Sequence, residues 1–198
     1  MTLRPAAFLD RDGVINIDRG YVSRAEDFEF VTGVFEGAAA LQRLGFALVV
    51  ITNQSGIGRG LYSETDLLAL NRWMGDQFGQ HSVHIDGVFY CPHHPTEAFG
   101  RYRCECDCRK PAPGMLLRAA RALNLDLTRS AMFGDRVSDL QAAAAAGVPL
   151  RYLLGTNGVS RPKPVDAAGL SIAEFTSLQQ AAASVELHVG VSLLASTP

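Results

Sequence analysis

Hydrophobic residues fall into two alternating patterns along most of the chain. Residues 6–9 (AAFL) form a short continuous apolar run, and residues 46–51 (FALVVI) form a second one. Between them, residues 34–44 carry apolar side chains at helical spacing, and this pattern stops at Gly45. Because short continuous runs are typical of buried strands and spaced apolar residues of helices, this part of the chain predicts strand, helix, strand.

The same alternation continues further along the chain. Ser63, with Asp66 three residues later, is an N-capping signature and predicts a helix to about Phe78. The next predicted elements are a strand at 88–90, a helix from Pro113 to about Asn124, a strand at 131–133, a helix at 137–146 ending at Gly147, and a strand at 150–154. This order predicts an α/β fold with a doubly wound, mostly parallel, Rossmann-like sheet covered by helices on both faces.

The pattern fades after Gly155, where GTNGVSRPKP predicts a loop, and one weak helix follows near residues 178–183. A chain of 198 residues, 47% of them hydrophobic, suffices for one well-buried domain and hardly for two. No internal repeat is present. We therefore expect a single domain over residues 1–198, with its core at about 6–154.

Charge and hydropathy exclude some classes of partner. The formal charge is −2 at pH 7 and no Lys/Arg cluster occurs, which argues against a nucleic-acid binder. The first residues, MTLRPAAF, contain too short an apolar run for a signal peptide, and no segment approaches the roughly 20 apolar residues of a membrane helix. We expect a cytoplasmic protein, taken as a monomer, that binds neither nucleic acid nor membrane.

Three polar clusters each follow a predicted strand: DRDG at 10–13, TNQSG at 52–56 and GDRVSD at 134–139. In doubly wound sheets, ligands bind beyond the carboxyl ends of the strands. Asp10 and Asp12, at i and i+2 of an extended segment, should point toward one spot, where two like charges repel unless a cation or a reaction uses them. These clusters predict the functional site.

The residue types in these clusters favour phosphoryl transfer. Singly, each has an ordinary structural explanation: a cap or turn for Asp10 and Asp12, a β-branched strand residue for Thr52, a solvated surface for Lys110, and a turn for Asp135. Together they supply a nucleophile, a proton carrier, a cation and donors for phosphoryl oxygens. Only two of the eighteen basic residues are lysines, which favours a specific use of Lys110 as a compact point charge.

The four cysteines lie within one short segment that leads directly into Arg109 and Lys110. Cys91-x-His93 and Cys106-x-Cys108 form two chelating pairs, the ligand set of a closed structural zinc site. Cys104 would then be a bystander, and His94 is not expected to bind because adjacent side chains diverge. The alternative is a disulfide or free thiols, which a reducing compartment disfavours. We predict a zinc-binding loop at residues 91–108.

The ordered set DxD, threonine, lysine and GDxxxD resembles the haloacid dehalogenase-like phosphatases over about residues 6–154. This resemblance implies that Asp10 is the nucleophile and that Asp12 protonates the leaving alcohol and then activates water. It also implies that Thr52 and Lys110 hold the phosphoryl group, and that Mg²⁺ is bound by Asp10, the Asp12 backbone carbonyl and Asp135. Asp139 would support the site rather than bind the metal. Neither interval between motifs has room for a cap domain, so the cysteine segment should form a wall of the site.

The segments FLDRDGVIN, DRGYV, CPHHP, CDCRKPAPGM and GDRVSDLQAA narrow the resemblance to the heptose 1,7-bisphosphate 7-phosphatases that feed bacterial surface-sugar (lipopolysaccharide) synthesis. The histidinol-phosphate phosphatases, which share the zinc loop, are the alternative. A sugar bisphosphate has a second anion, for which Arg109 offers a bidentate donor. The resemblance implies substrate contacts from Asp18, Arg19, Gly20, Tyr21, Thr52, Asn53, Gln54, Ser55, Arg109, Lys110 and Arg136. A different class of function, a non-catalytic zinc-stapled scaffold, is disfavoured because all the catalytic residue types are intact.

Overall fold

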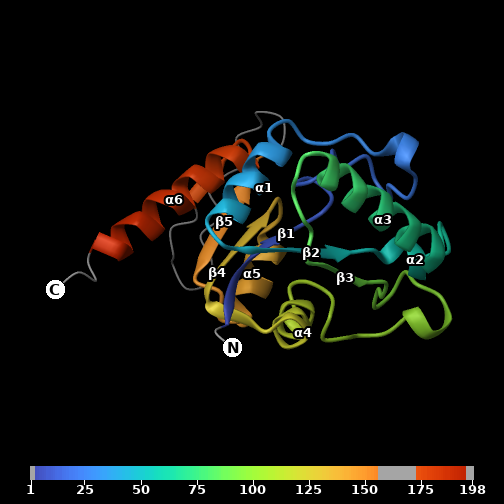
Figure 1. Ribbon diagram of the computed structural model, residues 1–198. Helices are drawn as coiled ribbons and strands as arrows, with labels where there is room; N and C mark the ends of the chain where they lie inside the picture. Colours follow the sequence, from blue (N-terminus) through green and yellow to red (C-terminus); the bar gives the residue numbers. More distant parts are fainter. Residues whose placement is uncertain (1–2, 156–172, 195–198) are drawn as a thin grey trace.

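The computed structural model describes residues 3–155 and 173–194. In this part of the chain six parallel strands form one sheet, flanked by helices on both faces (Figure 1). Across the sheet the order is β3 (Gly87–Cys91), β2 (Ala47–Asn53), β1 (Arg4–Leu9), β4 (Leu125–Gly134), β5 (Leu150–Leu154) and β6 (Ala173–Phe175). The predicted doubly wound parallel sheet is confirmed.

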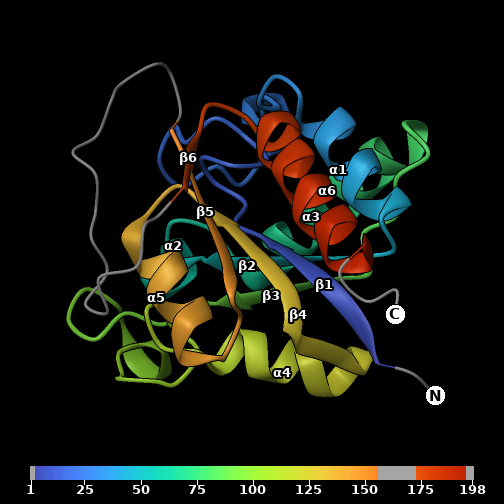
Figure 2. The same cartoon turned by 90° about the vertical axis from the view of Figure 1, so that its left-hand side faces the viewer.

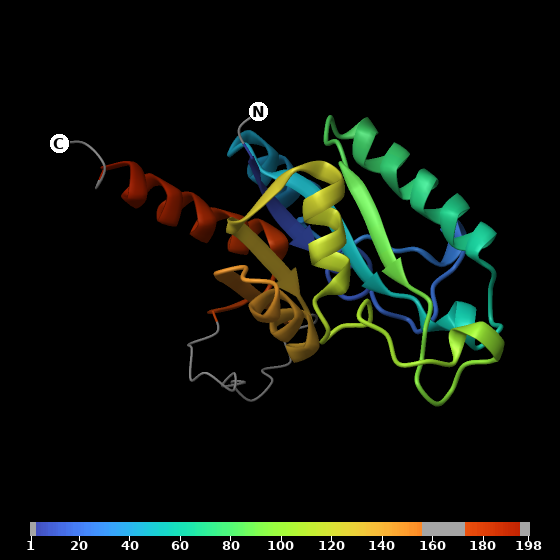
Figure 3. The same ribbon diagram turned by 90° about the horizontal axis from the view of Figure 1, so that it is seen from below.

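The helices divide between the two faces (Figures 2 and 3). One face carries α1 (Val34–Arg43), α3 (Glu64–Gln80) and α6 (Leu178–Leu194), and the other carries α4 (Gly114–Leu123) and α5 (Val137–Ala145). Strand β1 shows why both faces are covered: Ala7 and Leu9 are buried in the first core, whereas Ala6 and Phe8 are buried in the second. Three short elements complete the described fold, namely η1 (Ala25–Asp27), α2 (Ser55–Gly58) and η2 (Gly100–Tyr102).

Local sequence signals place several element ends correctly. The Ser63 hydroxyl accepts the Asp66 N–H at 3.1 Å, and the Asp66 carboxylate accepts the Ser63 N–H at 2.8 Å, so α3 begins with the predicted capping box. Helix α4 ends at Leu123 and is capped by Asn124, which adopts a left-handed conformation with φ 53°. Between the motif-bearing strands, the described residues hold only η1 with α1, and then α2, α3, β3 and the cysteine segment, so the expected capless architecture is confirmed.

The structure differs from the sequence prediction at several places, including the short elements η1, α2 and η2, which were not predicted. Strand β4 starts at Leu125, directly after α4, because its polar first half pairs with Arg4 and Pro5 at the amino end of β1 before a register shift. The three-residue strand β6 was not predicted. Helix α6 begins at the predicted Leu178 but runs to Leu194, so the prediction of a short helix was wrong. The predicted loop after Gly155 lies outside the described residues.

The strand order places the reversal of the sheet between β1 and β4. From β1 the chain adds β2 and β3 on one side, whereas β4 is followed by β5 and β6 on the other. Ligands of doubly wound sheets bind in the crevice at such a reversal. Asp10 follows β1 and Asp135 follows β4, and the Asp10 N–H donates to the Phe133 carbonyl at 2.9 Å. Among the described residues, no helix combines the length and the apolar character needed to cross a membrane.

Candidate active site

A cavity of about 390 Å³ opens at the carboxyl ends of β1 and β2. The four predicted catalytic residues, Asp10, Asp12, Thr52 and Lys110, all line it. The other lining residues are Asp18, Gly20, Tyr21, Asn53, Gln54, Ser55, Arg59, Tyr62, Arg109, Arg136, Ser138 and Asp139. The fold therefore brings the three motif clusters to one place.

Three buried acids and one lysine cluster at this cavity: Asp10, Asp139 and Lys110 line it, whereas Asp135, a predicted magnesium ligand, lies beside them and is not a lining residue. Carboxylate oxygens of Asp10, Asp135 and Asp139 lie within 4.8 Å of one another. The Lys110 ammonium lies 2.9 Å from Asp10 Oδ1 and 2.7 Å from Asp139 Oδ1, and it donates to the Ile51 carbonyl at 2.8 Å. Asp139 also accepts the Arg136 N–H at 3.0 Å. Three carboxylates facing one ammonium leave a negative site of oxygen ligands, which suits a hard cation such as Mg²⁺.

Burial controls the ionisation of these acids. It raises the pKa of Asp10 to about 8; Lys110 opposes that rise, while Asp139 and Asp135 add to it. Burial and the neighbouring Asp139 raise the pKa of Asp135 to about 6. Burial alone would lower the pKa of Lys110, but the attraction of Asp10 and Asp139 is larger and raises it, so the ammonium stays charged.

Asp12 has a separate environment from the acid cluster. Its carboxylate accepts two hydrogen bonds from the Arg11 guanidinium, at 3.2 and 3.0 Å, one from Asn16 at 3.0 Å and one from Gln54 at 2.9 Å. Arg11 is fully buried and also donates to the Val22 carbonyl at 2.7 Å. Sequence reasoning missed Arg11, although a basic residue between two acids was a visible signal.

Gly13 explains why the DxD motif ends in glycine. Its φ of +91° lies in the left-handed region that favours glycine. A Cβ at this position would come within 2.6 Å of the Asp135 carboxyl carbon. Gly13 therefore allows the loop after β1 to approach the acid that follows β4.

The predicted substrate residues differ in what their side chains contact. Asn53 pairs with the Lys110 backbone, accepting its N–H at 3.1 Å and donating to its carbonyl at 3.2 Å. Arg109 lines the cavity and donates to the His93 carbonyl at 3.2 Å, and Arg136 pairs with Asp18 at 2.9 Å. Arg19 is not among the lining residues; its guanidinium pairs with Glu29.

Three lining residues were not predicted: Arg59, Tyr62 and Ser138. The guanidinium of Arg59 lies 5.5 Å from the centre of the Tyr21 ring. Ser138 belongs to GDRVSD, and Arg59 and Tyr62 follow TNQSG closely in the sequence, which was the available signal. The cysteine segment was expected to form a wall of the site. Only its end, Arg109 and Lys110, lines the cavity, and its cysteines do not.

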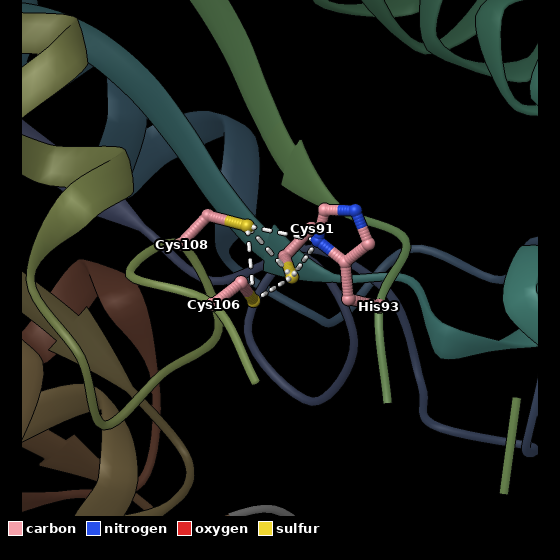
Figure 4. A group of neighbouring side chains, drawn as sticks. All are labelled: Cys91, His93, Cys106 and Cys108. Carbon is pink, nitrogen blue, oxygen red and sulfur yellow. Dashed lines mark hydrogen bonds between the residues drawn. The ribbon is translucent and has the colours of Figure 1, made fainter. Parts of the chain in front are cut away.

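A second group of ligating atoms lies beside the cavity (Figure 4). Cys91, His93, Cys106 and Cys108 point toward one another, with the Cys108 sulfur 3.1 Å from that of Cys91, 3.3 Å from that of Cys106 and 3.3 Å from His93 Nδ1. Four ligands at a zinc bonding distance of about 2.3 Å in a tetrahedron would lie about 3.8 Å apart. The Cys91 sulfur lies 3.7 Å from His93 Nδ1 and 3.6 Å from the Cys106 sulfur, near that separation, and the distances from the Cys108 sulfur are shorter. Within the described residues, Cys104 and His94 do not belong to the group, as predicted from the spacing.

The fold and these two clusters define a haloacid dehalogenase-like phosphatase, and comparison with known proteins agrees. A family described as HAD-hydrolase-like matches residues 107–178. The D-glycero-beta-D-manno-heptose-1,7-bisphosphate 7-phosphatases of Vibrio cholerae serotype O1 and Escherichia coli K12 are 51% and 46% identical, over 86% and 89% of this chain and 89% and 93% of theirs. The crystal structure of D,D-heptose 1,7-bisphosphate phosphatase from B. bronchiseptica, complexed with magnesium and phosphate, has a TM-score of 0.74 and 30% identity, covering 93% of this chain and 99% of that one. The chain belongs to the family of the heptose 1,7-bisphosphate 7-phosphatases.

Proposed function

We propose that this protein is a Mg²⁺-dependent phosphatase that removes the 7-phosphate of D-glycero-D-manno-heptose 1,7-bisphosphate, in the synthesis of lipopolysaccharide core precursors. The observation that carries the proposal is the placement of Asp10, Asp12 and Lys110 in one cavity at the reversal of the sheet. The names of the related phosphatases support the substrate. We place the activity in the cytoplasm, in a monomer that needs neither membrane nor nucleic acid.

The reaction proceeds in two displacements. Asp10 attacks phosphorus, an O–P bond forms to its carboxylate, and the bond between phosphorus and the C7 oxygen breaks as Asp12 gives that oxygen a proton. Asp12 then takes a proton from water, which attacks the aspartyl-phosphate, releases inorganic phosphate and restores Asp10. Lys110 and the Thr52 hydroxyl hold the oxygens of the transferring group.

The acid cluster fits magnesium, and Asp10, the Asp12 backbone carbonyl and Asp135 would hold it. When bound, Mg²⁺ would neutralise charge on the phosphoryl oxygens and relieve the repulsion among the acids. Asp139 keeps a supporting role, because its carboxylate already contacts Lys110 and the Arg136 backbone. The Cys91, His93, Cys106 and Cys108 group would hold a structural Zn²⁺ that fixes the segment leading to Arg109 and Lys110.

Arg109 and Arg136 favour a substrate with a second phosphate. Both guanidinium groups belong to cavity-lining residues, and each can bind an anion with two parallel hydrogen bonds. Histidinol phosphate, the alternative substrate, brings a cation that these groups would repel.

The test is phosphate release from a panel of sugar mono- and bisphosphates and histidinol phosphate, compared by kcat/KM. Highest kcat/KM for the heptose bisphosphate supports the proposal, and highest kcat/KM for histidinol phosphate refutes it in favour of the alternative. A non-catalytic scaffold would release no phosphate even from p-nitrophenyl phosphate with Mg²⁺.

Arg109→Ala is expected to lower kcat/KM for the sugar bisphosphate by about 100-fold and for p-nitrophenyl phosphate by less than about threefold, because only the first substrate presents a remote anion. Steady-state kinetics on both substrates measures this difference. Arg103→Ala, an exposed arginine of the same segment that does not line the cavity, is the matched control. Equal losses on both substrates in Arg109→Ala would instead assign this arginine to the core chemistry or to the fold.

Magnesium is expected to stabilise the protein more strongly at about pH 8 than at about pH 5. The folded-state pKa values of Asp10 and Asp135 lie above their ordinary value of 3.8. Between that value and the raised ones, the folded state binds more protons than the unfolded state, so stability without magnesium falls as pH rises. A bound cation offsets this loss of stability only at pH values where the carboxyl groups of Asp10 and Asp135 are ionised. Thermal unfolding across this pH range, with and without MgCl₂, measures the effect.

Asp135→Asn is the companion variant for this measurement, because it removes one of the proposed magnesium ligands. Its magnesium-dependent gain in Tm should be small at every pH. A gain that is the same at both ends of the range in the wild type, or one that survives in Asp135→Asn, would contradict the assignment.

A further inference from the structure

We propose that Gln54 and Tyr62 form a positioning pair that sets the orientation of Asp12 as proton donor and of Thr52 as phosphoryl ligand. This inference deepens the proposed function and rests on it. It also changes the interpretation of Gln54, which sequence resemblance implied to be a substrate contact. Gln54 is 2% exposed, and its side chain is engaged within the protein at both ends.

The hydrogen bonds of the Gln54 amide use all of its polar atoms. Its nitrogen donates to Asp12 Oδ2 at 2.9 Å and to Thr52 Oγ1 at 2.8 Å, which accounts for both hydrogens. Its oxygen accepts the Tyr62 hydroxyl. If the amide turned over, its oxygen would face the carboxylate of Asp12, and its nitrogen would face the Tyr62 hydroxyl. The Asp12 carboxylate, which can only accept, disfavours the turned-over amide, and the Tyr62 hydroxyl holds the amide oxygen at the other end, so the two groups together keep the donating side of Gln54 toward the reacting groups.

This arrangement determines what Thr52 can do. Because the Thr52 oxygen accepts a hydrogen bond from Gln54, its own hydroxyl hydrogen is left to donate to a phosphoryl oxygen. The same amide group contacts Asp12, so one side chain fixes the relative position of the proton donor and the phosphoryl ligand. Arg11 and Asn16 also hold Asp12, and Gln54 adds the connection to Thr52.

The glycine at position 56 leaves the space in which the Tyr62 ring lies. The ring lies against Gly56 in α2, where a Cβ would come within 2.2 Å of ring carbon Cε1, so only glycine admits the ring there. Burial raises the pKa of Tyr62 to about 12, and the hydroxyl therefore stays protonated and able to donate under assay conditions. Tyr62 also lines the cavity, which places its hydroxyl bond to Gln54 at the site itself.

The test compares substrates whose leaving groups differ in their need for a proton. An alkoxide such as the sugar oxygen leaves only when protonated, whereas p-nitrophenolate leaves as a stable anion, so misplacing Asp12 should slow the sugar phosphate selectively. We expect Tyr62→Phe to lower the ratio of kcat/KM for the sugar phosphate to kcat/KM for p-nitrophenyl phosphate by about tenfold. Tyr90→Phe is the matched control, since it removes a partly buried tyrosine hydroxyl that donates to Glu64 at 2.7 Å and does not line the cavity. It should leave the ratio unchanged.

A second variant keeps the inference falsifiable if Tyr62→Phe folds poorly. Gln54→Met has similar length but no donor, and we expect it to lower activity on both substrates, through Thr52, and to lower the same ratio by about tenfold or more. An unchanged ratio in either variant, measured on folded protein, would overturn the positioning role, because the two substrates would then have lost activity equally. A wild-type protein that hydrolyses neither substrate would instead refute the proposed function.

Discussion

Asp10→Asn protein is expected to keep less than a few per cent of wild-type kcat on any phosphate ester, because a carboxamide oxygen is a poor nucleophile. The change converts the proposed nucleophilic carboxylate into an amide, and Asp139 cannot take its place without moving, because its carboxylate contacts Lys110 and the Arg136 backbone. The loss should be in kcat, since the residues that hold the substrate remain. Steady-state phosphate release measures it.

The folded structure should survive this substitution. Asparagine has nearly the shape of aspartate and can still accept the Arg11 N–H, which Asp10 Oδ1 accepts at 2.7 Å. The substitution removes the ion pair with Lys110, but it also removes one of three mutually repelling acids. Asp126→Asn is the matched control. Asp126 pairs with Arg129 at the amino end of β4, whereas the active-site cavity lies at the carboxyl end of the sheet. Retention of substantial turnover by purified, folded Asp10→Asn would show that Asp10 is not the nucleophile.

Much of the fold and of the site follows from the sequence for identifiable reasons. A short apolar run such as 46–51 between turn residues is typical of a buried strand, and a strand–helix alternation has few parallel solutions. The polar clusters then meet without further information, because parallel strands all end at the same edge of the sheet. Asp10, Thr52 and Arg136 line one cavity for this reason, whereas Lys110 reaches it from the end of the cysteine segment.

Other features depend on contacts that no local pattern specifies. Nothing in the isolated segment TNQSG shows that the Gln54 amide bonds to Asp12 and Thr52, because those contacts depend on how loops after different strands pack. Arg11 is a charged residue that becomes fully buried through its pairing with Asp12 and Val22. The amino half of β4 is held in the sheet by pairing with Arg4 and Pro5, although residues 126–130 have little strand character of their own.

Cys108→Ser is expected to lose the bound zinc, to unfold at a clearly lower temperature and to lose most of its activity without any change to an acid of the site. Wild-type protein purified without added metal should carry about one zinc per chain. The Cys108 thiol is 3% exposed and contacts the sulfur atoms of Cys91 and Cys106, so a serine there removes a thiolate from the centre of the group. Structural zinc sites contribute roughly 10–16 kcal/mol of binding free energy, which is also folding free energy.

The effect on activity follows from the position of Cys108 in the chain. Arg109 and Lys110 come directly after it, and Arg109 also donates to the backbone of the ligand His93, so loss of the metal releases the segment that presents both cations to the cavity. Cys104→Ser is the matched control, because Cys104 is a cysteine of the same segment that lies outside the ligand group in the described residues. It should keep its zinc, its Tm and its activity. Metal analysis of the two purified variants decides between the assignments: zinc lost in Cys104→Ser but kept in Cys108→Ser would mean that Cys104 is the ligand and Cys108 the spare.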